Sequence, residues 1–273
     1  MGFLKNKIDC HQHVNISEFL SAEEEGELAK KIQEDLNDRR SMMASNGIGS
    51  AVLMPSSVYV KSKGIDSTRR AQEILLEYQA SDPELFPWLG CSVEPQHYSA
   101  GGELLSEFLA SGCYSLVTWH NRSHGVSADA PIMAELVGIA TEYGKPVFLH
   151  AAGNLDHEEA WRVARLVKKC PKARFVILDG LMTLASGQVL TDLAQETDNV
   201  WLDIANALPV RRVIEEAGKS IGWERIVFGS CFYSSPYSFA RCGPLEEFLA
   251  SPVDDEVRDR VLRQNILTIF DAG

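Results

Sequence analysis

Two histidines near the amino terminus, His11 and His13, have a spacing that suits metal binding. They follow the short apolar run 8–10, which is typical of a β-strand. On an extended strand, side chains two residues apart point to the same face, so the two imidazoles should lie side by side. Such a pair can bind one divalent ion, with N–metal distances of ~2.0–2.1 Å for zinc. Two solvated histidines would show the same pattern, so other parts of the chain must distinguish the two interpretations.

Eight short apolar segments alternate with helical patterns along the chain. We predict strands at 8–14, 50–54, 88–93, 114–119, 145–149, 175–178, 200–204 and 226–228. Strands that are apolar on both faces and alternate with helices indicate a parallel sheet covered by helices. Eight such units in 273 residues predict an α/β protein with a single (β/α)8 TIM barrel over residues 1–273. An open doubly wound sheet is the alternative, but no strand–helix junction carries its GxGxxG fingerprint.

Side chains that can do chemistry stand at the ends of these predicted strands. In a barrel of this type, the loops at the carboxyl ends of the strands build the active site. The residues at these positions are His11, His13, Glu94, Trp119, His120, His150, Asp179, Asp203 and Cys231. Four of the seven histidines, His11, His13, His120 and His150, are among them, which is more than chance is expected to place there.

The composition limits the partners and the compartment. Acidic residues outnumber basic ones by 38 to 26, for a net charge of −12. Nucleic acids and anionic membranes both require basic surface, so we expect neither as a partner. The six cysteines form no CxxC pair, and the amino terminus lacks the apolar core of a signal peptide. We therefore expect reduced thiols and a soluble, cytoplasmic protein.

Five segments spread over the whole chain form a characteristic set. They are Ile-Asp-Cys-His-Gln-His at 8–13, Gly-Lys-Pro-Val-Phe-Leu-His at 144–150, Asn-Val-Trp-Leu-Asp at 199–203, Glu-Arg-Ile-Val-Phe-Gly-Ser at 224–230 and the closing stretch 265–270. Together they resemble the amidohydrolase superfamily, in its amidohydrolase-related branch, which includes aminocarboxymuconate-semialdehyde decarboxylase. The resemblance implies a distorted barrel, a small-molecule substrate, and one divalent ion held by His11, His13 and His150. The ion is usually zinc, with manganese as the alternative, and members are often homodimers.

Two positions depart from the pattern of this family. An aspartate normally follows the strand-eight Phe-Gly-Ser, where this chain has Cys231, and a histidine normally ends strand six, where it has Asp179. A Cys231 thiolate can ligate zinc, which would close the site. Alternatively, Cys231 is a bystander and Asp179 supplies the acid–base carboxylate, or the metal has been lost. We take Asp179 and Cys231 as the catalytic candidates.

Three further residues are candidate substrate contacts, and each has a structural alternative. Trp119 can stack on a planar substrate or cap the barrel. His120 lies in a loop, where it can contact substrate or solvent. Arg241 can bind a substrate carboxylate bidentately or bridge surface acids. Asp203 stands in an apolar strand, where a buried carboxylate needs a partner in the structure or in the site.

The sequence therefore predicts a metal-dependent hydrolase or decarboxylase that acts on a small, carboxylated or cyclic molecule through a metal-activated water. The alternative is a catalytically degenerate barrel with a binding or regulatory role, because Cys231 and Asp179 both differ from the family pattern. Turnover of any substrate by metal-loaded protein distinguishes the two.

Overall fold

Nine parallel strands form one curled sheet in the part of the chain that the structure describes. This computed structural model describes residues 6–16, 19, 26–56, 63–152, 156–207 and 210–271. The strand order is β8-β7-β6-β5-β4-β3-β2-β1-β9. The strands are β1 (Lys7–Val14), β2 (Ile48–Pro55), β3 (Trp88–Cys91), β4 (Leu116–Trp119), β5 (Val147–His150), β6 (Phe175–Leu178), β7 (Val200–Asp203), β8 (Ile226–Val227) and β9 (Phe232–Tyr233).

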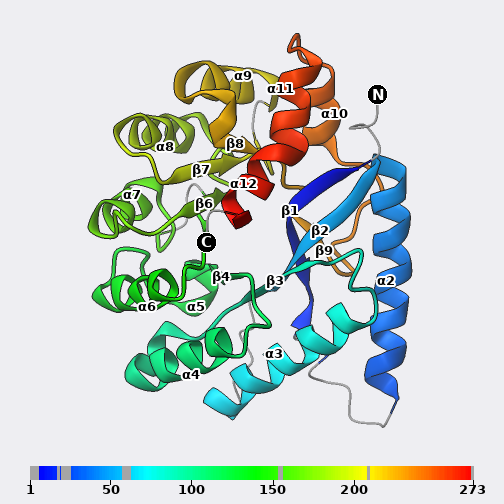
Figure 1. Cartoon of the computed structure of the whole chain (residues 1–273), viewed down its shortest axis with the longest axis vertical. Helices are drawn as coiled ribbons and strands as arrows, with labels where there is room; N and C mark the ends of the chain where they lie inside the picture. The colour runs from blue at the N-terminus through cyan, green and yellow to red at the C-terminus, as the bar shows by residue number, and fades with distance from the viewer. Residues whose placement is uncertain are drawn as a thin grey trace.

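Helices surround the outer face of this sheet (Figure 1). The longer ones are α2 (Glu27–Asn46), α3 (Ile65–Ala80), α4 (Tyr98–Ala110), α6 (Pro131–Glu142), α7 (Ala160–Lys169), α8 (Leu184–Glu196) and α9 (Val210–Ile221). Shorter ones are η2 (Pro95–His97), α5 (Asn121–His124), η3 (Trp223–Arg225), α10 (Gly243–Leu249), α11 (Asp255–Asp259), η4 (Arg260–Gln264) and α12 (Asn265–Asp271). Among the described residues, none of these helices is both long enough and apolar enough to cross a membrane.

The sheet closes irregularly between its last strands and β1. β1 pairs with β2 on one side and with the two-residue β9 on the other. Next to β8, the closure includes a backbone hydrogen bond from Cys10 N to Phe228 O at 2.9 Å. The buried Asp9 carboxylate strengthens this seam, because its Oδ1 accepts a hydrogen bond from Ser230 N at 2.9 Å. The predicted distorted (β/α)8 barrel is thus confirmed, with β9 as a strand that the sequence patterns did not predict.

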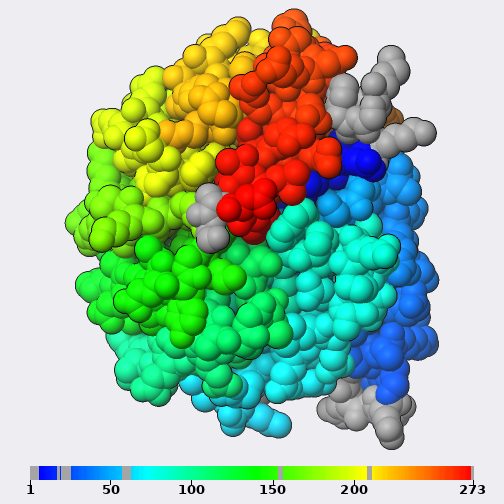
Figure 2. Space-filling view, viewed as in Figure 1, coloured from blue at the N-terminus to red at the C-terminus, as the bar shows by residue number. Residues whose placement is uncertain are grey.

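Strand side chains alternate between two hydrophobic layers. In β5, Val147 and Leu149 pack between sheet and helices, whereas Phe148 packs inside the barrel. At one end of the barrel, α12 adds the buried Ile266 and Ile269 to the inner layer. Figure 2 shows this carboxy-terminal segment, in red, lying across the centre of one face. The functional side chains gather at the opposite end, where the strands finish.

An irregularity in β1 places its histidines. Residues 9–12 of β1 run against residues 51–53 of β2, so β1 carries one extra residue here, a β-bulge. Cys10 belongs to the inner layer, and His13 pairs with Met54, which also belongs to it. Cys10 and His13 are three residues apart, so simple alternation would put them on opposite faces. The bulge allows both to face the inside.

Candidate metal centre

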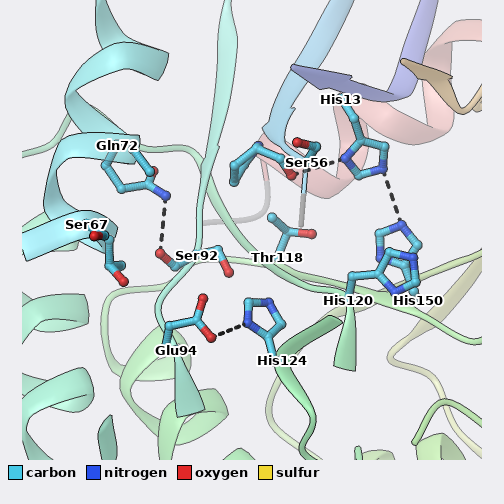
Figure 3. Close-up of a pocket in the computed structure, with 13 residues that line it drawn as sticks. His13, Ser56, Ser67, Gln72, Ser92, Glu94, Thr118, His120, His124 and His150 are labelled. Atoms are coloured by element: carbon cyan, nitrogen blue, oxygen red, sulfur yellow. Dashed lines mark hydrogen bonds and ion pairs between the residues drawn. The ribbon is translucent and has the colours of Figure 1, made fainter. Parts of the chain in front are cut away.

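Three histidines from β1 and β5 converge at the carboxyl end of the barrel. His11 Nε2 lies 2.9 Å from His13 Nε2, and His13 Nε2 lies 3.3 Å from His150 Nε2. All three side chains are buried. Figure 3 shows the His13 and His150 rings turned toward each other. The predicted trio is therefore brought together, with the same ring nitrogen of each residue facing a common point.

Each of these rings is held through its other nitrogen. His11 Nδ1 donates to Asp203 Oδ2 at 2.7 Å. His13 Nδ1 donates to the Pro55 carbonyl oxygen at 3.2 Å, and His150 Nδ1 donates to the Trp119 carbonyl oxygen at 3.1 Å. A carbonyl oxygen only accepts, so Nδ1 of His13 and His150 carries the proton and Nε2 keeps its lone pair. Metal-binding histidines are oriented in this way by carboxylates and carbonyls.

The electrostatics of the cluster favour a cation. Burial, together with His11 and His120, lowers the pKa of His13 well below its ordinary value. Burial likewise lowers the pKa of His150. Two neutral imidazoles that turn their lone pairs toward each other at 3.3 Å repel unless a cation lies between them. Two nitrogen ligands of a tetrahedral zinc site are ~3.3 Å apart, so the donor set fits one divalent ion.

His11 differs from the other two histidines in its charge. Burial acts to lower its pKa, but Cys231, Asp179 and Asp203 face the ring and raise the pKa well above its ordinary value. Burial raises the pKa of the Asp203 carboxyl to about 6. Without an ion, a proton on His11 balances the neighbouring carboxylates, and an ion that binds Nε2 must displace it.

Gly229 allows Asp203 to reach His11. A Cβ atom at position 229 would lie 2.6 Å from Asp203 Oδ2 and 2.7 Å from His11 Cβ, which is closer than such atoms can approach. The other oxygen of the carboxylate, Asp203 Oδ1, accepts a hydrogen bond from Asp179 N at 2.9 Å. Asp203 therefore lies between the His11 ring and the end of β6, and His11 and Asp179 N are the partners that this buried carboxylate requires.

Asp179 and Cys231 stand beside the three histidines. The ligand atoms of His11, Asp179 and Cys231 lie within 4.8 Å of one another, and Asp179 Oδ1 is 4.0 Å from His11 Nδ1. Asn206 Nδ2 donates to the same Asp179 oxygen at 2.9 Å. Asp179 and Cys231 have positive φ angles of 59° and 55°. This conformation costs a non-glycine residue about 1–2 kcal/mol, and strained backbone of this kind clusters at functional sites.

Two of the predicted substrate contacts do not reach the site. Trp119 is fully buried between sheet and helices, and its indole N–H donates to the Val93 carbonyl at 3.0 Å. The Arg241 side chain is 82% exposed and pairs with Glu246. Both expectations of substrate contact are corrected, because Trp119 fills the core and Arg241 bridges a surface acid.

His120, the third predicted contact, does lie at the site. Its ring stacks on His150 with centroids 4.2 Å apart and an interplanar angle of 7°. His120 Nδ1 pairs with the fully buried Glu158, whose Oε1 also accepts from Arg122 N at 2.9 Å. Sequence reasoning missed Glu158, because two adjacent glutamates before a helix are typical of a solvated first turn. It also missed Tyr233, whose ring stacks on His13 at 4.4 Å.

Two cavities border this cluster. The larger one, which we call the outer cavity, measures about 680 Å³ and extends from the ends of β6 and β8 to the segment after β4. Its lining includes His120, Arg122, Asp179, Asn206, Cys231 and Tyr233. The smaller one, which we call the side chamber, measures about 30 Å³ and borders His13, His120 and His150 (Figure 3). His120 lines both cavities and so stands between them.

Three solved structures share this architecture over nearly the full length of both chains. A 2,6-dihydroxybenzoate decarboxylase complexed with 2,6-dihydroxybenzoate gives a TM-score of 0.73 at 17% identity, over 98% of this chain and 99% of that one. A 5-carboxyvanillate decarboxylase from Novosphingobium aromaticivorans with bound manganese gives 0.73 at 15% identity, over 98% of each chain. The 4-oxalomesaconate hydratase from Rhodopseudomonas palustris gives 0.72 at 14% identity, over 97% of this chain and 96% of that one. At these identities the likeness shows the fold.

Two further comparisons concern sequence alone. No curated protein matches the chain. The family model described as Amidohydrolase (Amidohydro_2) matches residues 8–272. Because this match covers nearly the whole chain, including all three converging histidines and both departures at the ends of β6 and β8, the chain belongs to the amidohydrolase family.

Proposed function

We propose that the protein is a metal-dependent hydrolase or decarboxylase that acts on a small carboxylated molecule. The observation that carries the proposal is the convergence of Nε2 of His11, His13 and His150, each ring being held through Nδ1 by an oxygen. A divalent ion bound there supplies a Lewis acid and lowers the pKa of a bound water to about 7. Zinc is the ion we propose, and manganese, which one of the similar structures binds, is the alternative.

Asp179 is the proton carrier in this proposal. Its carboxylate lines the outer cavity beside the metal-binding rings, and Asn206 fixes its Oδ1. A carboxylate in this place can take a proton from, or return one to, a substrate bound in the outer cavity. Burial raises the pKa of the Cys231 thiol, which favours the neutral form and suits a residue that shapes the wall.

Arg122 gives the outer cavity its affinity for an anion. It lines the cavity, and in the described ranges its guanidinium pairs with no carboxylate, whereas Arg162 and Arg241 each do. A guanidinium without an acid partner can bind a substrate carboxylate bidentately. We therefore transfer to Arg122 the role that the sequence suggested for Arg241. Two of the similar structures are decarboxylases of aromatic carboxylates, which is consistent with this substrate class.

Metal analysis followed by a substrate screen tests the proposal. Protein purified without chelator should hold about one equivalent of ion per chain, and His150→Ala should hold little. The metal-loaded protein is then screened with hydroxylated aromatic carboxylates, lactones and amides. Turnover that His150→Ala abolishes supports the proposal. Sub-stoichiometric metal that added zinc or manganese does not increase would refute the metal centre.

The degenerate barrel, the second interpretation of the sequence, receives no support from the family match or the similar structures. A protein with full metal content and no turnover across the whole panel would restore it.

A further inference from the structure

The side chamber next to the metal histidines has no part in the proposed reaction. It lies between α3 and the carboxyl ends of β2 to β5 (Figure 3), and it shares His120 with the outer cavity. Apart from the histidines, most of the residues that line it are of polar types: Thr68 and Gln72 come from α3, and Ser92 and Glu94 follow β3. A cavity with this lining is unusual inside a barrel, where apolar side chains normally fill the space.

Three oxygen atoms in the chamber wall are buried without a hydrogen bond. Thr68 Oγ1, Gln72 Oε1 and Ser92 Oγ have no partner among the described residues. Thr68 is 7% exposed and Gln72 is 2% exposed. A buried polar atom left unpaired costs about 1–3 kcal/mol, and native interiors contain few of them. Three around one small cavity indicate a site for an occupant that bonds to them.

Gln72 determines the chemistry of this occupant. Its Nε2 donates to the Ser92 carbonyl oxygen at 3.2 Å, which leaves Oε1 as a buried acceptor that needs a donor. A carboxylate, Glu94, also lines the chamber, where its Oε2 pairs with His124 Nδ1 at 2.8 Å. An occupant with a carboxylate would place its acceptor oxygens against Gln72 Oε1 and the Glu94 carboxylate, which are also acceptors. A carboxylate occupant is therefore excluded. A hydroxyl group both donates and accepts, which matches the wall.

The volume limits the size of the occupant. A water molecule needs about 10–15 Å³ of cavity measured in this way, and the chamber offers about 30 Å³. Two water-sized groups fill it, and an aromatic ring does not fit.

We propose that the side chamber is a hydroxyl site. It binds water in the free protein, and a hydroxyl substituent of the substrate replaces water on binding. The second step rests on the proposed function; the first does not. Arg122 lies across His120, in the outer cavity, and attracts a carboxylate. A substrate that spans the metal histidines would carry a hydroxyl group toward Gln72 and an acid group toward Arg122, which makes hydroxylated carboxylic acids the preferred class.

A crystal structure of the free, metal-loaded protein tests the first step. Ordered water should lie within hydrogen-bond distance of Thr68 Oγ1 and Gln72 Oε1. Thr68→Val should lose this water, whereas the matched control Thr141→Val should keep it, because the Thr141 hydroxyl bonds to the Val137 carbonyl on α6. A dry chamber in the wild-type crystal would overturn the whole proposal. His11→Ala, which removes one of the three converging histidines but no residue of the chamber wall, should leave the chamber water in place, so this result is independent of activity.

Binding measurements test the second step. The isomeric hydroxybenzoates and their methyl ethers are titrated into metal-loaded protein by calorimetry. At least one hydroxybenzoate should bind about tenfold or more tightly than its ether, and Thr68→Val should reduce this ratio while Thr141→Val preserves it. The substrate step would be overturned if the protein bound every hydroxybenzoate and its methyl ether with equal affinity, or if it bound none of these compounds.

Discussion

Replacement of Asp203 by asparagine tests whether the histidine cluster is a metal site. The Asp203 carboxylate is fully buried and accepts hydrogen bonds from His11 Nδ1 at 2.7 Å and from Asp179 N at 2.9 Å. Asparagine has nearly the same size but offers one acceptor oxygen and one NH₂ donor. Whichever way the amide turns, it presents a donor to one of the two N–H groups. One of the two bonds is therefore lost.

The size of the effect follows from the bond to His11. Buried hydrogen bonds to charged groups contribute about 1.5–3 kcal/mol. A difference of 1.4 kcal/mol is about tenfold in an equilibrium constant, so zinc affinity should fall about 10- to 100-fold. The fold should persist, because the space left by Gly229 accepts a side chain of unchanged size.

Competition with a chelator of known affinity measures this loss. Asp192→Asn is the matched control, because Asp192 is an exposed α8 residue whose carboxylate accepts from Gln188. Zinc affinity should fall in Asp203→Asn and stay at the wild-type value in Asp192→Asn, with unchanged circular dichroism in both. An unchanged zinc affinity in folded Asp203→Asn would show that His11 is not held for metal binding, and the interpretation of the cluster would fail.

Three further predictions concern the same cluster and the outer cavity. Asp179→Asn should keep its metal and lose about 100-fold or more in turnover, because general acid–base groups contribute about 10²–10⁴-fold. Metal analysis and a rate assay on one preparation check this. Full activity would remove Asp179 from the mechanism. Arg122→Gln should weaken the binding of aromatic carboxylates about tenfold or more, while the exposed Arg241→Gln should not; calorimetry measures both, and equal losses would contradict the assignment. Zinc affinity should rise about tenfold per pH unit below the raised pKa of His11 and level off above it, because binding displaces one proton. A pH-independent affinity between roughly pH 6 and 8 would contradict this.

The barrel was predictable because its signal is repeated and local. Buried parallel strands are apolar throughout, so each of the eight segments carries its own evidence. The predicted segment 145–149 corresponds to β5 at Val147–His150, and the predicted segment 88–93 ends earlier, at Cys91. β9 has two residues and no periodicity of its own, and it is a strand only because Gln12 and His13 of β1 lie beside it. Tertiary pairing of that kind leaves no trace in a short window of sequence.

The convergence of the three histidines was predictable for a different reason. His11 and His13 lie in the second half of β1, and His150 ends β5, so the direction of the parallel strands brings all three to one end of the barrel. The bulge in β1 could not be predicted from the sequence pattern, although the orientation of His13 depends on it. Glu158 and Arg122 lie in connecting segments, where position is decided by packing rather than by period.

The two departures from the family pattern are easier to understand in space than in sequence. Asp179 follows β6 and Cys231 follows β8, with β7 between the two strands, and both residues lie near His11, so an acid at either position can act on the same ring. The chain has a thiol where the family resemblance implies an aspartate, and an aspartate where it implies a histidine. A carboxylate thus remains 4.0 Å from His11, and an imidazole remains at the site through His120, which stacks on His150. The residue types that acid–base chemistry requires are therefore still present around the metal-binding rings. The degenerate barrel that the sequence suggested as an alternative follows only when Asp179 and Cys231 are each compared with the family pattern separately, without regard to the other side chains around the histidines.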